Sequence, residues 1–312
     1  MTMEIIRDLN DIPKELKHSI ITIGNFDGIH LGHQAIFRKV LEEAVERNRK
    51  SLVITFDPHP QKVLHPEKKT FYLLTLLEEK LKLMEEMWID AVIVIPFTPE
   101  FSRNEAGTFI RNILWEKLKI QKIYIGYDYA FGRGKEGNAR FLKTMGEELG
   151  FQVEEIGAVT VDGMIVSSTN IRLSINEGQV SRAAKMLARP YNVSGVVVRG
   201  RQRGTDIGIP TANIESEKVI PGMGVYAIIA EVEGTRYQGV LNIGYSPTFG
   251  DNEFTIEVHL LNFQGDIYGK DIDLFFIERL RDEQRFDSPK LLVEQIKHDI
   301  DQAKHILAPY VI

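Results

Sequence analysis

Apolar runs and helical periods alternate along the first half of the chain. Short uninterrupted apolar runs are typical of strands buried on both faces, whereas apolar residues three or four apart indicate amphipathic helices. The runs predict strands at 18–23, 51–56, 91–95, 120–125 and 151–156. The helical spacings predict one helix that carries Ile36, Val40, Leu41 and Ala44, and others at 76–87, 105–118 and 139–149. This alternation predicts an α/β, Rossmann-like domain with a doubly wound parallel sheet.

From residue 192 the hydrophobic period becomes two, which is typical of antiparallel strands with one buried face. The period predicts strands at 192–198, 225–233, 236–243, 254–262 and 271–277, with a hairpin turn at Gly234-Thr235. A final amphipathic helix at 288–307 has Ser288 as its N-cap and Pro289 in its first position. The second half is therefore predicted to be a small antiparallel β-barrel with a terminal helix. We expect domains at 1–186 and 187–312.

Composition and charge narrow the class of protein. The 312 residues contain no cysteine, which excludes disulfides, thiolate nucleophiles and cysteine metal sites and fits a reducing cytoplasm. The net charge of −6 argues against broad binding of nucleic acid. No apolar run approaches the roughly 20 residues that span a bilayer, and the first residues do not resemble a secretory signal. We expect a cytoplasmic protein without nucleic-acid or membrane partners, either a monomer or a weak oligomer.

A glycine-rich turn with two histidines follows the first predicted strand. The segment Gly24-Asn-Phe-Asp-Gly-Ile-His-Leu-Gly-His33 leads directly into a helix, an arrangement that aims backbone N–H groups and the positive helix end at one anion. His30 and His33 are three residues apart and share a helix face, so both imidazoles can reach one phosphate. A glycine turn or a lone histidine is often only structural, but the joint pattern favours function. The candidate nucleotide-binding residues here are Gly24, Phe26, Asp27, Gly28 and Gly32.

Two more loops follow predicted strands, at the edge where ligands bind in open α/β sheets. Asp57-Pro58-His59-Pro60 is stiffened by its prolines, and it can be read as a rigid turn or as part of a site. The segment 126–132 sets Asp128 among aromatic residues that include Phe131. Such rings can belong to the core or stack on a flat ligand.

The segment Val166-Ser-Ser-Thr-Asn-Ile-Arg172 predicts the start of a short helix, with Ser168 or Thr169 as its N-cap. A cap alone would explain these residues. They would also suit a triphosphate, because a helix start offers hydroxyls, amides and an arginine together. Ser167, Ser168 and Thr169 are therefore candidate nucleotide contacts, and another short helix is predicted at 180–187.

The His-x-Gly-His motif resembles that of nucleotidyltransferases. Together with Thr-Phe-Asp-Pro-His-Pro at 55–60, it resembles the bacterial bifunctional riboflavin kinase/FMN adenylyltransferase family, also called FAD synthetases. The resemblance implies ATP as co-substrate, riboflavin and FMN as acceptors, and FMN and FAD as products. It implies that His30, His33 and Arg172 act at the reacting phosphates. It places the flavin contacts at Asp57, Pro58, His59, Asp128, Phe131, Arg281 and Phe286.

A second set of candidate residues opens the barrel half. Gly200-Arg-Gln-Arg-Gly204 is a glycine-rich loop that could cover phosphates, with Gly200 and Gly204 as its nucleotide contacts. Thr211 and Asn213 are two apart, so in an extended segment they point the same way and offer oxygens that suit Mg²⁺. Pro-Thr-x-Asn is also an ordinary turn, but this one matches the riboflavin kinase motif. Glu257 would be solvated on most barrel strands, whereas the resemblance implies that it is the catalytic base.

The chain departs from the family pattern near the kinase motif. The departures are Ala188, Thr205, Asp206, Ile209 and Asn262. They leave the strength and nucleotide dependence of the kinase open. One alternative is an FMN adenylyltransferase with a silent flavin-binding barrel, and another is a non-catalytic flavin sensor. Retention of both histidines, Thr211, Asn213 and Glu257 argues against the sensor.

Overall fold

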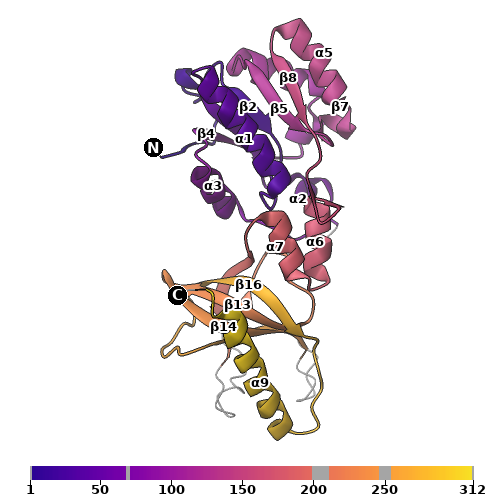
Figure 1. Ribbon diagram of the computed structural model, residues 1–312. Helices are drawn as coiled ribbons and strands as arrows, with labels where there is room; N and C mark the ends of the chain where they lie inside the picture. Colours follow the sequence, from indigo (N-terminus) through magenta and orange to yellow (C-terminus); the bar gives the residue numbers. More distant parts are fainter. Residues whose placement is uncertain (1, 68–70, 199–210, 246–253, 311–312) are drawn as a thin grey trace. The chain divides into compact units, whose positions relative to one another are not determined.

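The computed structural model describes residues 2–67, 71–198, 211–245 and 254–310. The chain forms two compact units, Met1–Ser167 and Ser168–Ile312, and Figure 1 colours them along the sequence. We describe each unit by itself. The functional boundary between residues 186 and 187 stays a prediction.

The first unit is built on the parallel sheet that the sequence predicts. Its six strands lie in the order β1 (Glu4–Ile6), β4 (Ala91–Pro96), β3 (Ser51–Asp57), β2 (Ile20–Ile23), β5 (Lys122–Gly126) and β8 (Gln152–Ile156). Every neighbouring pair is parallel. The edge strand β1 was not predicted, because only one of its three residues is buried and its apolar signal is short.

Helices cover both faces of this sheet. They are α1 (Leu31–Glu46), α2 (Pro60–Leu64), α3 (Leu77–Glu86), α4 (Ala106–Phe109), the π-helical continuation η3 (Ile110–Lys117) and α5 (Ala139–Leu149). Alternate residues of β3 enter different cores: Leu52 and Ile54 pack with side chains of η3 and α5, whereas Val53 packs with α1 and α3. Strand alternation therefore produces the doubly wound arrangement that we expected.

Short elements complete the first unit. They are the 3₁₀ turns η1 (Lys14–Leu16), η2 (Phe101–Arg103) and η4 (Arg133–Lys135), and the strand pairs β6 (Ala130–Phe131) with β7 (Gly137–Asn138) and β9 (Thr160–Val161) with β10 (Met164–Ile165). In the described part of the chain, no helix combines the length and the apolarity needed to cross a membrane.

The second unit contains the predicted barrel, and the barrel is closed. Its strand order is β11 (Tyr191–Val198), β12 (Ala212–Glu215), β15 (Phe254–Leu260), β14 (Thr235–Tyr245), β13 (Gly224–Val232) and β16 (Asp271–Arg281). The hairpin prediction was wrong by one residue, because Glu233 and Gly234 form the turn and both have positive φ. A two-residue turn with positive φ at both positions matches the twist of a hairpin.

Within its described residues, the second unit contains the helices α6 (Ser168–Asn176), α7 (Val180–Leu187) and α9 (Pro289–Leu307). The Ser288 side chain accepts a hydrogen bond from the Leu291 amide, which confirms the predicted N-cap of α9. The apolar face of α9 packs on the barrel (Figure 1), where Ala303 and Leu307 are fully buried.

Candidate active sites

Three predicted loops leave adjacent strands at one edge of the parallel sheet. The glycine turn follows β2, the Asp57-Pro58-His59 loop follows β3, and the segment 126–132 follows β5. β2 lies between β3 and β5, and the chain runs from β2 to β3 on one side but later returns to β5 on the other. This reversal makes the carboxyl end of β2 the topological switch point, where ligands bind in open α/β sheets.

The two histidines lie at the start of α1, and their rings stack. His30 is the N-cap residue, and its Nδ1 accepts a hydrogen bond from the His33 backbone N–H at 3.4 Å. The ring centroids are 3.6 Å apart, with an angle of 20° between the planes. The Phe26 ring meets the His33 ring edge-on at 5.2 Å. The motif therefore brings both imidazoles to the helix start, where the first amides have no acceptor within the helix.

Two glycines make room for these rings. A Cβ atom on Gly24 would lie 2.9 Å from the Phe26 ring, and one on Gly32 would lie 3.2 Å from the His30 ring. Gly28 has a φ of 92°, which strains any residue with a side chain. These glycines shape the turn around the aromatic side chains, so their predicted contacts with nucleotide stay a prediction.

The His33 imidazole is neutral when the site holds no anion. Burial, followed by the charges of His30 and Lys80, holds the pKa of His33 well below its usual value. Its Nδ1 is buried and has no hydrogen-bond partner among the described residues. An imidazole nitrogen left unpaired in a buried position can bind a polar group of a ligand.

Asp27 anchors the glycine turn to the segment that contains Leu74 and Thr75. Its carboxylate accepts hydrogen bonds from the backbone amides of Leu74 and Thr75, each at 3.0 Å. The Thr75 hydroxyl in turn accepts the Gly28 N–H at 2.9 Å. The sequence suggested a nucleotide contact for Asp27, and the structure gives it this anchoring role within the fold.

Lys80 is a charged residue of this region that sequence reasoning missed. It lies on α3, with only 6% of its surface exposed. Its ammonium donates hydrogen bonds to the Asn25 carbonyl oxygen at 3.1 Å and the Thr55 hydroxyl at 3.0 Å. One signal could have found it: Leu77, Lys80, Leu81 and Met84 share one helix face, so the lysine occupies a core position.

The other two loops place their predicted flavin contacts differently. His59 is buried and caps α2, because its Nδ1 accepts the Gln61 N–H at 3.1 Å and its ring lies 4.9 Å from that of Phe71. Asp57 and Pro58 are exposed at the end of β3. Asp128 is also exposed, on the loop where the Phe131 ring stacks on that of Tyr129.

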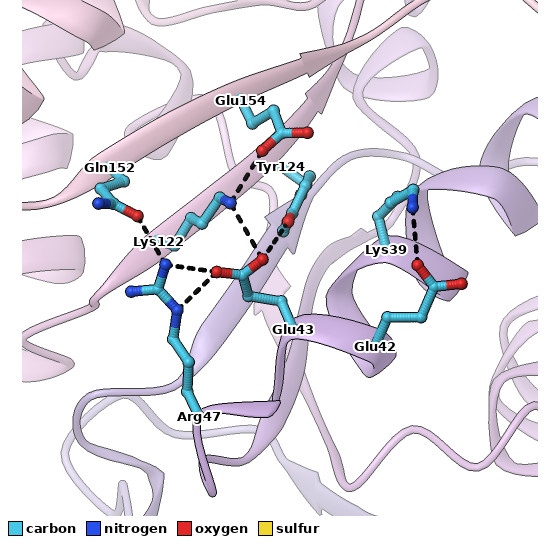
Figure 2. Close-up of polar contacts among 8 residues, drawn as sticks. All are labelled: Lys39, Glu42, Glu43, Arg47, Lys122, Tyr124, Gln152 and Glu154. Carbon is cyan, nitrogen blue, oxygen red and sulfur yellow. Dashed lines mark hydrogen bonds and ion pairs between the residues drawn. The ribbon is translucent and has the colours of Figure 1, made fainter. Parts of the chain in front are cut away.

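A polar network anchors the far end of α1 to the sheet, as Figure 2 shows. Glu43 on α1 accepts hydrogen bonds from Lys122 at 3.1 Å and Tyr124 at 2.8 Å, both on β5. Arg47 bonds Glu43 and reaches Gln152 on β8 at 2.9 Å. Although burial opposes it, hydrogen bonding by Tyr124, Lys122 and Arg47 lowers the pKa of Glu43. The helix that carries the histidines is therefore held at both ends.

The segment 167–172 falls at the division between the units. Ser167 is the last residue of the first unit, and the others begin the second. The predicted N-cap was wrong: α6 already begins at Ser168, so Ser168 and Thr169 lie in its first turn. The Arg172 guanidinium donates to the Ser168 carbonyl oxygen at 3.4 Å. Their predicted roles at the nucleotide stay predictions.

In the barrel, the predicted metal ligands and base lie on neighbouring strands. Asn213 on β12 is the register partner of Glu257 on β15. The Thr211 hydroxyl lies 3.4 Å from one Glu257 oxygen, and the Thr255 hydroxyl lies 3.2 Å from the other. The side chains of Thr211, Asn213 and Glu257 thus gather at one place.

The same cluster has the chemistry that Mg²⁺ requires. Asn213 Oδ1 is buried and lacks a hydrogen-bond partner within the described ranges. An unpaired buried amide oxygen lowers the stability of a protein unless a ligand supplies the missing partner. Beside a hydroxyl and a carboxylate, it makes a donor set of hard oxygens that suits Mg²⁺ with substrate phosphates.

The predicted flavin contacts of the barrel are partly engaged in structural contacts. Arg281 forms hydrogen bonds with both carboxylate oxygens of Asp299 on α9, from Nε at 3.0 Å and from a terminal nitrogen at 2.8 Å. The Arg281 guanidinium also lies 5.8 Å from the Phe286 ring centre. Gly200, Gly204, Thr205, Asp206 and Ile209 lie outside the described residues.

Comparisons with known proteins agree for both halves. A family model described as FAD synthetase matches residues 12–170, and one described as riboflavin kinase matches residues 187–307. A bifunctional riboflavin kinase/FMN adenylyltransferase of Buchnera aphidicola is 37% identical over 307 residues, covering 97% of this chain and 98% of the relative. The Escherichia coli protein of the same name is 35% identical, with 95% and 96% covered.

A solved structure shares the fold of the whole chain. It is described as a macrolide-efflux protein from Streptococcus pneumoniae and is 30% identical, with a TM-score of 0.85. The match covers 97% of this chain and 99% of that one. The two-unit architecture is therefore shared over nearly the full length of both proteins.

Proposed function

Since this chain belongs to the bifunctional riboflavin kinase/FMN adenylyltransferase family, we propose that its barrel phosphorylates riboflavin and that its first unit adenylylates the resulting FMN. One observation carries the proposal. Each half holds a separate set of polar side chains that includes a buried atom without a partner among the described residues, His33 Nδ1 in one and Asn213 Oδ1 in the other. Each of these two atoms lies among candidate site residues, where a bound ligand would complete its hydrogen bonding.

In the adenylylation, a phosphate oxygen of FMN bonds to the α-phosphorus of ATP. The bond from that phosphorus to the bridging oxygen of the β-phosphate breaks, and pyrophosphate leaves. The FMN phosphate is already ionised, so the protein needs no nucleophile of its own and contributes position and charge. His30 and His33 offer polar ring atoms at the start of α1, beside the amides of the turn. An anion there raises the pKa of His33 and favours its charged form.

In the kinase reaction, Glu257 takes the proton from the terminal hydroxyl of the riboflavin chain. The hydroxyl oxygen then attacks the γ-phosphorus of ATP, FMN forms, and ADP leaves with the electrons of the broken bond. The Thr255 hydroxyl orients the Glu257 carboxylate through the contact at 3.2 Å. This contact supports the proposed role, because it holds one carboxylate oxygen and limits the orientations of the base.

Thr211 and Asn213 would hold Mg²⁺ in the barrel, with support from the unpaired Asn213 oxygen. When bound, the ion neutralises charge on the ATP phosphates. Arg172 with Ser167, Ser168 and Thr169 would bind the nucleotide of the adenylyl transfer. We keep 1–186 and 187–312 as the functional domains, and we place the enzyme in the cytoplasm, where its substrate ATP is formed.

The proposal is tested by separating the flavins formed by the purified chain. One sample receives riboflavin, ATP and Mg²⁺, and the other receives FMN in place of riboflavin. We expect FMN and then FAD in the first, and FAD in the second. FAD from FMN alone would contradict the kinase and favour a silent barrel, whereas flavin binding without any product would support the sensor.

A further inference from the structure

We propose that Lys80 is a positioning residue for adenylyl transfer, which links the glycine turn to the end of β3 and supplies a fixed positive charge to the histidine site. The inference rests on the proposed function of that site. It adds a residue from α3, an element to which the sequence assigned no function.

The contacts of Lys80 join the two loops that flank β2 and β3. Asn25 belongs to the glycine turn, and Thr55 lies two residues before Asp57, where β3 ends. The Thr55 hydroxyl lies 3.4 Å from the Asn25 carbonyl oxygen, so the ammonium completes a small buried cluster. Loss of Lys80 would leave both oxygens without their shared donor and let the two loops move apart.

Among the residues that the structure describes, the buried ammonium of Lys80 forms no ion pair. Both hydrogen bonds of Lys80 go to uncharged oxygens, a carbonyl and a hydroxyl. The carboxylate of Asp27, which belongs to the turn, accepts hydrogen bonds from the backbone amides of Leu74 and Thr75. A cation bound in this way keeps a strong field, because buried charges are screened weakly.

The charge of Lys80 interacts with ionisable groups on the glycine turn, at the end of β3 and on α1. Burial lowers the pKa of Lys80 to about 8. The charges of Asp27 in the turn and Asp57 at the end of β3 oppose this shift, because they favour the charged form. On α1, the charge of Lys80 contributes to the lowered pKa of His33, after burial and His30. In the free protein the cationic groups therefore disfavour one another. When a polyphosphate binds, its negative charge attracts each of these cationic groups.

A pH profile separates this role from a purely structural one. The pH dependence of kcat/KM reports groups of the free enzyme, so the value for ATP in FAD synthesis should fall above about pH 8, where Lys80 loses its proton. Stability should not fall with it. A lysine whose pKa is lowered by folding is better tolerated when neutral, so its contribution to stability rises between about pH 8 and about pH 10.

The test compares Lys80→Met, Lys80→Arg and Lys82→Met with the unchanged chain. Lys82 lies on the same helix but is exposed, so its replacement is the matched control. We expect Lys80→Met to lower kcat/KM for ATP on the order of 10²-fold and to abolish the alkaline decline. Lys80→Arg should move the decline beyond the range of measurement, because a guanidinium stays charged. FMN synthesis by the barrel should stay unchanged in all variants.

The outcomes distinguish the inference from the function on which it rests. If the unchanged chain makes no FAD from FMN, the proposed function fails. The inference fails if the unchanged chain makes FAD but Lys80→Met lowers the rate equally at every pH and keeps the alkaline decline. The role of Lys80 would then be structural. Should Lys80→Met not fold, the comparison of the unchanged chain with Lys80→Arg still decides.

Discussion

The imidazole of His30 lies flat against that of His33, with 3.6 Å between the ring centroids. Two charged imidazoles at this separation would repel each other strongly, since they are buried. A positive charge on both rings at once is therefore disfavoured until an anion arrives. The free site is arranged to gain positive charge when phosphate binds.

Replacing His33 by alanine should remove FAD synthesis selectively. The loss of one preorganised group at a site of developing charge lowers the rate on the order of 10²–10³-fold. FMN synthesis from riboflavin should stay nearly intact, because its groups lie in the other unit. Rates of both reactions measured on the same preparation check this. An equal loss of both activities in a folded variant would contradict the assignment of two sites.

The lowered pKa of His33 should also make stability depend on pH. Folding lowers its pKa below the usual value, so the stability it contributes is complete above about pH 6.5 and is lost as the pH falls towards the folded pKa. Urea unfolding near pH 7 and near pH 5 measures the effect. The unfolding free energy of the unchanged chain should fall more than that of His33→Gln, by up to about 1.4 kcal/mol per pH unit. Parallel decreases would show that His33 does not titrate in this window.

Replacing Glu257 by glutamine should have the opposite selectivity to the His33 variant. Without its base, the barrel should form FMN on the order of 10²–10⁴-fold more slowly. FAD synthesis from added FMN should continue at the normal rate, which also shows that the protein is folded. Unchanged phosphorylation of riboflavin would remove Glu257 from the mechanism.

Breaking the pair between Arg281 and Asp299 should destabilise the barrel. Asp299 is 2% exposed and accepts three hydrogen bonds from the guanidinium. Asp299→Asn leaves the partly buried Arg281 without its countercharge, which costs up to about 3 kcal/mol. Asp301→Asn is the control, because its exposed pair with Lys304 contributes at most about 1 kcal/mol. Similar urea midpoints for both variants would show that the buried pair does not stabilise the second unit.

The network at the far end of α1 offers another matched pair of variants. Glu43→Gln removes the charge that Lys122 and Arg47 share, at a cost of about 1–3 kcal/mol. Glu42→Gln removes only an exposed pair with Lys39, visible beside the network in Figure 2, and should change stability by less than about 0.5 kcal/mol. Thermal unfolding at neutral pH compares them. The Glu43 contribution should fade in acid, since its pKa is lowered by folding.

Patterns in the sequence predicted most of the fold because buried strands and amphipathic helices have strong periods. The missed strands are short: β6, β7, β9 and β10 have two residues each, β1 has three and β12 has four. β12 begins two residues after Pro210 in the sequence, and alternation over so few residues resembles a turn. The helix predicted at 105–118 exists, but its last eight residues are π-helical, a hydrogen-bond pattern that side-chain spacing does not reveal.

The candidate sites were predictable where a motif is local in sequence. The His30/His33 pair and the Thr211/Asn213 pair each lie within one short segment. Lys80 was missed because its acceptors, Asn25 and Thr55, are 55 and 25 residues away along the chain. The pairing of Arg281 with Asp299 likewise depends on where α9 packs, which no local pattern specifies.

The 16 residues of α1 form a rod roughly 24 Å long, with the histidines at one end and the Glu43 network at the other. Gln152, on the edge strand β8, thus helps to position the helix that carries the histidines, although it lies at the opposite end of that helix. A substitution at this edge can therefore reach the histidines only through the placement of the helix, and not through a contact with substrate.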